Sequence, residues 1–250
     1  MNYSPGKRLL LIVVILFLGG CATTTGAGLS TSESATDAGT PNIDPFERVN
    51  RQVYAFNQDF DNKILIPIAK NYREHVPNPV RTAIYNFFNN VTEPRNFINS
   101  LLQGKLHNAA DSLSRLLVNT TVGLGGFIDI ATMSGLERRI EDIGQTLAVW
   151  GFGPGPYIVL PILGPSSGRD VFGVYTYFNY TDPRGYISDR AARFSMFAVD
   201  LVDTRSRFLR ATSVFGFASL DPYLFERESY FQTRNDLIYD GRPPIDEYGQ

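Results

Sequence analysis

The sequence has few of the side chains on which catalytic and metal sites usually depend. Its 250 residues include one cysteine, two histidines and one tryptophan. A single cysteine cannot form an intramolecular disulfide, so packing and polar contacts must hold the folded chain together. Two histidines and one cysteine are also too few for a zinc-type site, which needs about four nitrogen or sulfur ligands. We therefore expect no metal and no other cofactor.

Charge of one sign and long apolar runs are lacking too. The 23 lysines and arginines balance 25 acidic residues, and they are not clustered. Because nucleic-acid surfaces need clustered cations, we expect no nucleic-acid partner. Beyond residue 20 there is no run of about 18 apolar residues, the length needed for a membrane-spanning helix. The glycine-rich phosphate loop of ATPases is also absent, so any transport would be passive or driven by partners.

One stretch matches a hydrolase motif. Residues 164–168 read GPSSG, the G-x-S-x-G pattern of the nucleophile elbow. That mechanism needs an acid and then a histidine after the serine, but His75 and His107 both precede Ser166, and no lysine follows Lys105. We predict no catalytic residue and no enzymatic activity. The stretch is instead expected to be a turn followed by a helix N-cap, with Asp170 favourable to the helix dipole.

The N-terminus has the pattern of a secretory signal. Lys7 and Arg8 precede the apolar run Leu9–Leu18, and Gly19 and Gly20 lead to Cys21. The run is too short to span a bilayer, where about 20 residues are needed. Leu18 to Cys21 resembles a bacterial lipobox, which implies cleavage before Cys21 and its modification with diacylglycerol and an N-acyl chain. An ordinary signal peptide with an incidental cysteine is the alternative.

The remaining chain divides by composition. Residues 22–43 are rich in Thr, Ser, Gly and Ala, and are predicted to be a flexible linker. Ala22 follows the cysteine, where an aspartate would favour retention at the inner membrane in enteric-type bacteria, so its absence favours the outer membrane. We expect residues 1–20 to be a signal peptide, 21–43 the lipidated cysteine and linker, 44–242 one domain, and 243–250 a tail.

Apolar spacing in residues 44–242 predicts an all-α domain of many short amphipathic helices with little or no β structure. Val49, Val53, Phe56 and Phe60 recur at helical spacing, and a helix opening at Asn78-Pro79 should turn Val80, Ile84, Phe87 and Phe88 inward. Further helices are expected over residues 92–104, 106–118, 142–150, 167–178, 188–209 and 222–239. Residues 156–161 (PYIVLP) could form one short extended piece, which the prolines limit.

Glycine is concentrated in the middle of the chain. Eleven of the 22 glycines lie within residues 123–173. Glycine costs conformational entropy unless a turn or a close backbone approach requires it. Two interpretations stay open: ordinary turns and helix ends, or a segment that moves in function.

Several segments in order resemble the MlaA (VacJ) family of outer-membrane lipoproteins. The most specific are residues 119–129 (NTTVGLGGFID) and 144–147 (GQTL). The others are residues 44–51, 53–57, 76–81, 86–90 with Glu93-Pro94, 101–104, 155–161, 164–166 and Arg169-Asp170. The resemblance covers about residues 44 to 240, although residues 171–187 follow the family only in outline.

The resemblance implies a ring-shaped helical protein that lies in the inner leaflet of the outer membrane, on its periplasmic face, beside a trimeric porin. Such a protein withdraws misplaced phospholipids from the outer leaflet through a polar channel. It then passes them to a periplasmic carrier of the MlaC type. Half of a roughly 30 Å hydrocarbon core would fit helices of about 10–16 residues, the lengths expected here.

By analogy we expect a set of residues to border the channel, with packing as the alternative role for each. They are Phe56, Asn57, Asn119, Gly123, Gly125, Gly126, Phe127, Asp129, Trp150, Gly153, Gly155 and Tyr157. The competing function is a structural lipoprotein that tethers or scaffolds an envelope complex without lipid cargo.

Overall fold

The computed structural model describes residues 43–215 and 220–244, and for residues 210–215 only the backbone. Cys21, the predicted signal peptide and nearly all of the predicted linker lie outside the described residues, as do residues 245–250. What the sequence predicts for those segments stays a prediction.

Helices form most of the described chain. Its first elements are α2 (Glu47–Phe60), the π-helical turn η1 (Asp61–Leu65), α3 (Ile66–His75), α4 (Asn78–Leu102) and α5 (Leu106–Thr121). They are followed by α6 (Ile130–Met133), α7 (Ile143–Val149), β1 (Tyr157–Leu160), β2 (Gly164–Ser167) and α8 (Gly168–Thr176). The last are the π-helical η2 (Tyr177–Thr181), the 3-10 helix η3 (Pro183–Tyr186), α9 (Arg190–Phe215) and α10 (Pro222–Ile238).

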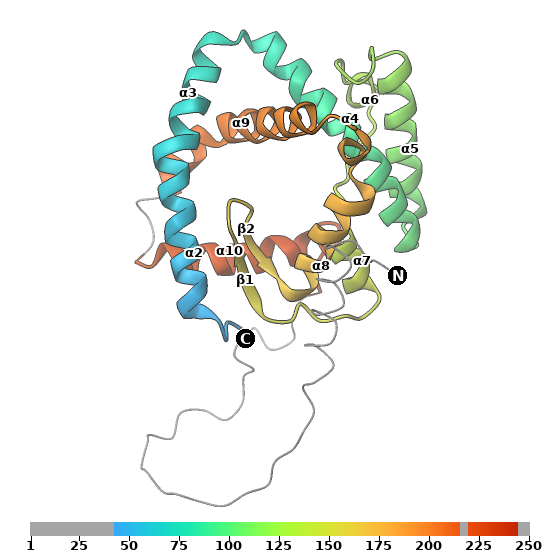
Figure 1. Cartoon of the computed structure of the whole chain (residues 1–250). Coiled ribbons are helices and arrows are strands. Elements are labelled where there is room, and N and C mark those ends of the chain that lie inside the picture. The colour runs from blue at the N-terminus through green and yellow to red at the C-terminus, as the bar shows by residue number, and fades with distance from the viewer. Residues whose placement is uncertain (1–42, 216–219, 245–250) are drawn as a thin grey trace, which may run out of the picture. The chain divides into compact units, whose positions relative to one another are not determined.

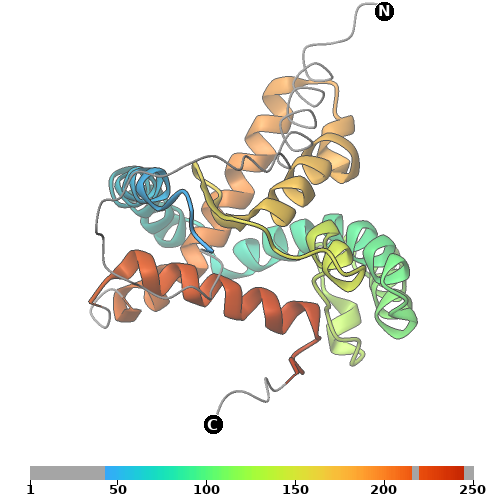
Figure 2. The same ribbon diagram turned by 90° about the horizontal axis from the view of Figure 1, so that it is seen from below.

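The helices of residues 43–244 are arranged around a ring. In Figure 1, α2 and α3 form one side, α4 and α9 the adjacent side, α8 and α7 the opposite side, and α10 with the strands the last. Contacts between α3 and α9, α4 and α9, α7 and α8, α7 and α10, and α2 and β1 join neighbouring elements. α5 packs against α4 outside this frame, and Figure 2 shows the same arrangement from below. The predicted all-α, ring-like domain is confirmed, apart from one small hairpin.

Acidic and hydroxyl side chains begin several helices. Asp129, Asp142 and Asp221 accept hydrogen bonds from backbone N–H groups in the first turns of α6, α7 and α10. Ser167 accepts from the backbone N–H of Asp170 at the start of α8, which confirms the predicted N-cap, although the turn predicted before it is strand β2. Each cap satisfies N–H groups that have no partner within the helix.

α4 corrects the prediction of a helix break near Thr92. The helix runs through Pro94 as one element of 25 residues. Proline removes one backbone donor and usually costs about 3 kcal/mol inside a helix. Here α4 packs against α5, and Glu93, Asn96 and Asn99 beside the proline are buried. Tertiary contacts therefore outweigh the local cost.

Two helices are longer than expected. α4 has 25 residues and α9 has 26, whereas α9 was expected to end at Leu209. At about 1.5 Å per residue each is near 38 Å long, more than twice the roughly 15 Å of one hydrocarbon leaflet. The expected range of about 10–16 residues does not hold for these two, and neither could stand upright within one leaflet.

Residues 157–167 form a two-stranded antiparallel hairpin, not a single extended piece. Tyr157 is opposite Ser167, and Leu160 is opposite Gly164. Because a two-stranded sheet has only edge strands, Pro165 can occupy β2 without breaking an inner ladder. β2 (GPSS) was missed because it lacks the β-branched and aromatic residues that identify strands.

Two asparagines attach the hairpin to α2. The Asn50 amide donates to the carbonyl oxygen of Tyr157 at 3.0 Å and accepts from the N–H of Val159 at 2.9 Å. Two turns later, Asn57 donates to the carbonyl oxygen of Leu160 at 2.9 Å and accepts from the N–H of Ile162 at 2.8 Å. An i, i+7 spacing places both side chains on one face of the helix.

A small aromatic core lies between the hairpin, α2 and α10. Tyr157, Val159 and Tyr223 are buried, with Tyr54 and Tyr230 packed against them. The ring of Tyr157 lies edge-on to that of Tyr223, with centroids 6.1 Å apart.

Several helices expose their apolar face and bury their polar face. On α5 the buried side chains include Asn108, Ser112, Arg115 and Asn119. Leu106, Leu113 and Leu117, the apolar stripe that predicts the helix, are exposed. Val49, Phe56 and Val80 are exposed too, which corrects the expectation that Val80 turns inward. A protein surrounded only by water normally shows the reverse.

None of the described helices is both long enough and apolar enough to cross a membrane.

Candidate functional site

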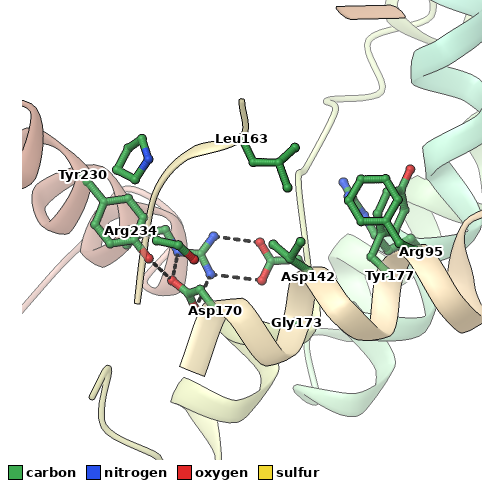
Figure 3. Close-up of a pocket in the computed structure, with 12 residues that line it drawn as sticks. Arg95, Asp142, Leu163, Asp170, Gly173, Tyr177, Tyr230 and Arg234 are labelled. Carbon is green, nitrogen blue, oxygen red and sulfur yellow. Dashed lines mark hydrogen bonds and ion pairs between the residues drawn. The ribbon is translucent and has the colours of Figure 1, made fainter. Parts of the chain in front are cut away.

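A cavity of about 240 Å³ lies between α4, α7, α8, α10 and the hairpin (Figure 3). Leu163, in the hairpin turn, lines it, and this turn extends toward the middle of the ring in Figure 1. The cavity therefore lies on the inner side of the ring. Its polar lining consists of Arg95, Asp142, Ser166, Asp170, Tyr177, Tyr230 and Arg234.

Arg234 joins two acidic side chains at one end of this cavity. Its guanidinium donates to both carboxylate oxygens of Asp142, at 2.7 and 3.0 Å, and to Asp170 at 3.0 Å. The Tyr230 hydroxyl also donates to Asp170. Burial raises the pKa of the Asp142 carboxyl, but the hydrogen bonds and charge of Arg234 lower it by a larger amount. The pKa of Asp142 therefore lies below its usual range. Asp142 is thus held ionised, with its charge paired to Arg234 within the protein.

Two glycines allow α7 and α8 to meet beside this cluster. A Cβ atom on Gly144 would lie 2.2 Å from a carboxylate oxygen of Asp170, and one on Gly173 would lie 3.0 Å from the backbone nitrogen of Gly144. Any larger side chain would separate the helices and pull Asp142 away from Arg234. At these positions the glycine requirement comes from close packing.

Arg95 lines the other side of the cavity and stacks on an aromatic ring. Its guanidinium carbon lies 5.0 Å from the centre of the Tyr177 ring. Burial raises the pKa of the Tyr177 phenol, so the ring stays neutral. The Tyr177 hydroxyl accepts from Arg184 at 3.0 Å, which fixes the ring on its far side.

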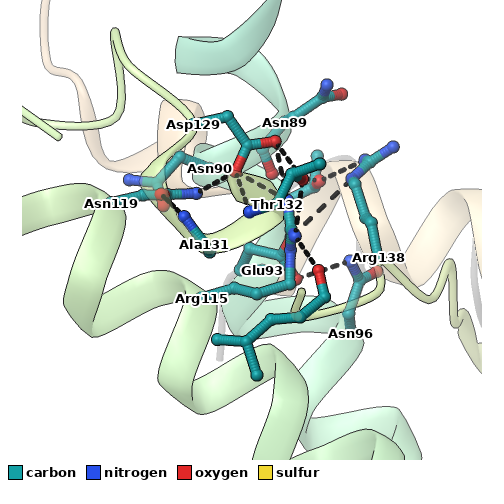
Figure 4. Close-up of polar contacts among 12 residues, drawn as sticks. Asn89, Asn90, Glu93, Asn96, Arg115, Asn119, Asp129, Ala131, Thr132 and Arg138 are labelled. Carbon is teal, nitrogen blue, oxygen red and sulfur yellow. Dashed lines mark hydrogen bonds and ion pairs between the residues drawn. The ribbon is translucent and has the colours of Figure 1, made fainter. Parts of the chain in front are cut away.

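A second polar network lies between α4, α5 and α6 (Figure 4). Buried Arg115 donates to Glu93 at 3.0 Å, to Asp129 at 3.0 and 3.2 Å, and to the Leu136 carbonyl oxygen at 2.7 Å. Asn119 donates to Asp129 at 3.0 Å and accepts from the N–H of Ala131. Two of the predicted channel residues, Asn119 and Asp129, thus hold α6 against α5.

The same network holds Asp129 in its ionised form. Burial would raise the pKa of its carboxyl, but hydrogen bonds from Thr132, Asn119 and Arg115 together lower it to about 2.

Gly123, Gly125, Gly126 and Phe127, also predicted channel residues, lie in the loop between α5 and α6. Gly126 and Phe127 pack against α4. A Cβ on Gly126, at φ +96°, would lie 2.6 Å from the side chain of Asn90. One on Gly123 would lie 2.2 Å from the Ile128 carbonyl oxygen, whereas Gly125, at φ +73°, has open space beside it. Phe127 stacks on Phe87, with ring centroids 5.1 Å apart. The loop is a tight turn closed on the helix.

The other predicted channel residues lie on α2, at the end of α7 and in the hairpin. Phe56 is exposed on α2 and stacks on Phe60, and Asn57 binds the hairpin backbone. The Trp150 indole N–H donates to the Leu102 carbonyl oxygen at the end of α4, at 3.0 Å. Tyr157 is fully buried in the aromatic core.

The two remaining predicted glycines precede the hairpin. Gly153 has open space beside it. Gly155 adopts φ +68° and approaches Gly168.

The structure does not bring together the two segments predicted to border the channel, residues 119–129 and 150–157. Residues 119–129 contact α4 at Asn90, and Trp150 contacts it at Leu102, 12 residues later. Twelve helical residues span about 18 Å. Whether either segment borders a passage stays a prediction. Sequence reasoning missed Arg95, Asp142, Tyr177 and Arg234 as site residues, and it gave Asp170 only a helix-dipole role.

Ser166 and the histidines lie in separate settings. Ser166 is buried in β2 opposite Ile158 and lines the cavity. His75 contacts the Asn71 carbonyl oxygen within α3, and His107 lies near Asp111 on α5. Within the described residues, no group of three or more His, Cys, Asp or Glu side chains could hold a metal ion.

Comparison with known proteins decides the family. The family model for the MlaA lipoprotein matches residues 42–237. The chain belongs to the MlaA lipoprotein family. It is 34% identical over 203 residues to a Haemophilus influenzae protein named intermembrane phospholipid transport system lipoprotein MlaA, with 80% of each chain covered. It is 35% identical over 208 residues to the Escherichia coli K12 protein of the same name, with 79% of each covered.

A solved structure extends the MlaA match to three dimensions. Its description reads "Structural basis for maintenance of bacterial outer membrane lipid asymmetry". The TM-score is 0.69 at 33% sequence identity, and the match covers 78% of this chain and 98% of that one. The MlaA relatives are thus transport lipoproteins by name. That this chain has no catalytic activity stays a prediction.

Proposed function

We propose that this MlaA-family chain removes mislocalised phospholipids from the outer leaflet of the outer membrane and passes them to a periplasmic carrier of the MlaC type. The main support is the family match over residues 42–237, with relatives named for intermembrane phospholipid transport. Retrograde transport of this kind would maintain lipid asymmetry, the subject of the matching solved structure.

The outward apolar faces support a position in the inner leaflet on the periplasmic side. Leu106, Leu113 and Leu117 on α5 and Ile98 and Leu101 on α4 are exposed. Hydrocarbon or an apolar partner would cover them at a gain of roughly 25 cal/mol per Å². A lipid on Cys21 would add an anchor, and a trimeric porin would be the neighbour in the membrane.

The polar lining of the cavity beside α8 supports a hydrated route for lipid headgroups. Moving a charged headgroup through hydrocarbon is costly, so a passage must offer polar groups or water. The cavity beside α8 supplies such groups on the inner side of the ring. The channel residues expected from the sequence, with Gly125 and Gly126 in a gating loop, belong to the same proposal.

The test is deletion of the gene followed by quantification of outer-leaflet phospholipid with a surface-restricted acyltransfer reporter. Strains are complemented with wild type, with Cys21→Ala, and with the exposed-site control Arg48→Gln. We expect surface phospholipid to rise on deletion and to return to normal with wild type and with the control, but not with Cys21→Ala.

Two outcomes would refute parts of this proposal. If surface phospholipid stays at the wild-type level while envelope integrity fails, the chain scaffolds an envelope complex and does not transport lipid. If Cys21→Ala restores normal levels, the lipid anchor is not required.

A further inference from the structure

The cavity beside α8 is lined by one arginine, Arg95, that forms no ion pair with a described residue. Arg234 is paired with Asp142 and Asp170, and Arg169 lies 3.1 Å from Asp170. The two carboxylates thus face two arginines. Arg95, in contrast, makes no ion pair with any described residue, and its buried Nε atom has no hydrogen-bond partner there. Asp142 and Asp170 take their hydrogen bonds from Arg234 and Arg169, and the charge of Asp142 reaches Arg95 only through space, so the Arg95 donors are not used by a carboxylate of the cavity.

The setting of Arg95 favours an anion of a particular shape. Its guanidinium lies over the ring of Tyr177, which leaves the N–H groups at its edge free to donate. An arginine presented this way binds a phosphate or carboxylate through two parallel hydrogen bonds, which a lysine cannot do. A neutral ligand would leave the half-buried charge without compensation.

The size and rim of the cavity indicate which part of a lipid it would hold. Its volume of about 240 Å³ lies below the roughly 300–1,000 Å³ of pockets that enclose drug-sized ligands. A whole two-chain lipid cannot fit. Leu163, Val174 and Phe178 add an apolar rim beside the polar wall. A phosphate ester would reach Arg95 while its glycerol carbons contact this rim.

We propose that Arg95, stacked on Tyr177, binds the phosphate of a glycerophospholipid headgroup on the inner side of the ring. This inference rests on the proposed transport function, because it assigns the ligand chemistry of that route to one cavity. Arg234 and Asp142 form the preorganised wall against which the headgroup lies.

Binding to the purified full chain, in a phosphate-free maltoside detergent, tests the proposal. The ligand is dihexanoylphosphatidylglycerol below its micellar concentration, followed by calorimetry and phosphorus NMR. Dihexanoylglycerol and inorganic phosphate are the comparison ligands. We expect the phospholipid to bind, the phosphate-free lipid not to bind, and inorganic phosphate to bind at least about tenfold more weakly.

The variants separate recognition by Arg95 from general charge. Arg95→Gln should weaken phospholipid binding at least about tenfold, and Arg95→Lys should fall between it and wild type. Arg48→Gln removes an exposed arginine on α2 and should leave binding unchanged. Tyr177→Leu removes the ring on which Arg95 stacks and should also weaken phospholipid binding.

Several results would overturn the site. One is that Arg95→Gln binds the phospholipid as tightly as wild type does. Another is that dihexanoylglycerol binds as tightly as the phospholipid. A third is that inorganic phosphate binds as tightly as the phospholipid, which would make this a free-phosphate site. If Arg95→Gln fails to fold by circular dichroism, Arg95→Lys and Tyr177→Leu decide, and binding by both that equals wild type refutes the site. If gene deletion raises surface phospholipid but the purified chain shows no Arg95-dependent binding, the site alone is refuted. If binding depends on Arg95 but gene deletion leaves surface phospholipid unchanged, the transport function alone is refuted.

Discussion

Removing Arg115 should destabilise the chain more than removing any exposed arginine. Its side chain is 1% exposed and donates to Glu93, Asp129, Thr132 and the Leu136 carbonyl oxygen. Arg115→Met replaces it with an apolar side chain of similar length and leaves Glu93, also 1% exposed, without its closest cation. Breaking a buried ion pair on one side costs about 3–5 kcal/mol.

The magnitude can be narrowed from the structure. Arg138 stays 3.7 Å from Glu93 and Asn96 donates to it at 3.1 Å, so the stranded carboxylate keeps some compensation. We expect a loss near 3 kcal/mol, out of roughly 5–15 kcal/mol of total stability. For a chain of this size the melting temperature should then fall by about 6–12 °C.

Urea unfolding of the full chain in mild detergent, followed by far-ultraviolet circular dichroism, measures the change. Arg139→Met is the matched control, because its partner Glu137 is exposed and such pairs contribute at most about 1 kcal/mol. Adding Glu93→Gln to Arg115→Met should recover part of the loss, because the buried Glu93 carboxylate is removed, and only part, because Asp129 still lacks Arg115 and Arg138 loses Glu93. A loss below about 1 kcal/mol at unchanged denaturant slope would refute the assignment of Arg115 as the centre of this network.

Three further perturbations test other contacts. Because the folded pKa of Asp129 is about 2 against an ordinary value of 3.8, its contribution to stability is complete above about pH 5 and is lost progressively as the pH falls through 3.8 toward 2. Asp129→Asn should flatten the acid limb of a stability–pH curve there, and an unchanged limb would contradict the shift. Gly126→Ala should cost roughly 2–5 kcal/mol from left-handed strain plus overpacking, and Gly125→Ala about 1–2 kcal/mol from strain alone, as measured by urea unfolding. Asn50→Ala leaves two hairpin backbone groups unpaired and should cost roughly 2–6 kcal/mol, with a smaller loss for Asn57→Ala at the exposed hairpin end. Equal melting temperatures for the two asparagine variants would argue against this difference.

Apolar periodicity predicted where helices form but not which way they face. The stripe of Leu106, Leu113 and Leu117 marks α5 correctly, yet the structure exposes it and buries Arg115 and Asn119. Inferring that apolar residues turn inward assumes water on the outside. Spacing in the sequence carries no information about the surrounding solvent.

Local signals also failed where distant contacts decide. Pro94 indicates a break, but α4 continues because its flanking polar side chains are buried. β2 has no strand-forming residues. It forms because it pairs with β1, which packs against α2.

The candidate site was the least predictable part. Arg234 meets Asp142 across 92 positions of sequence, and Arg95 reaches Tyr177 from a different helix. No short motif records such pairs. Asn119 and Asp129 lie within one segment, and the sequence did select both, although the structure gives them a hydrogen-bonding role.

The asparagine contacts between α2 and the hairpin have a consequence for evolution. On the hairpin, Asn50 and Asn57 bind backbone N–H and C=O groups and no side chain. Every amino acid except proline offers both groups, so this attachment is indifferent to the identity of the residues it holds. The side chains of residues 161 and 163 can therefore change for another cargo or neighbour while the joint to α2 stays the same, whereas residue 162 must keep its N–H for Asn57 and tolerate a φ of +67°.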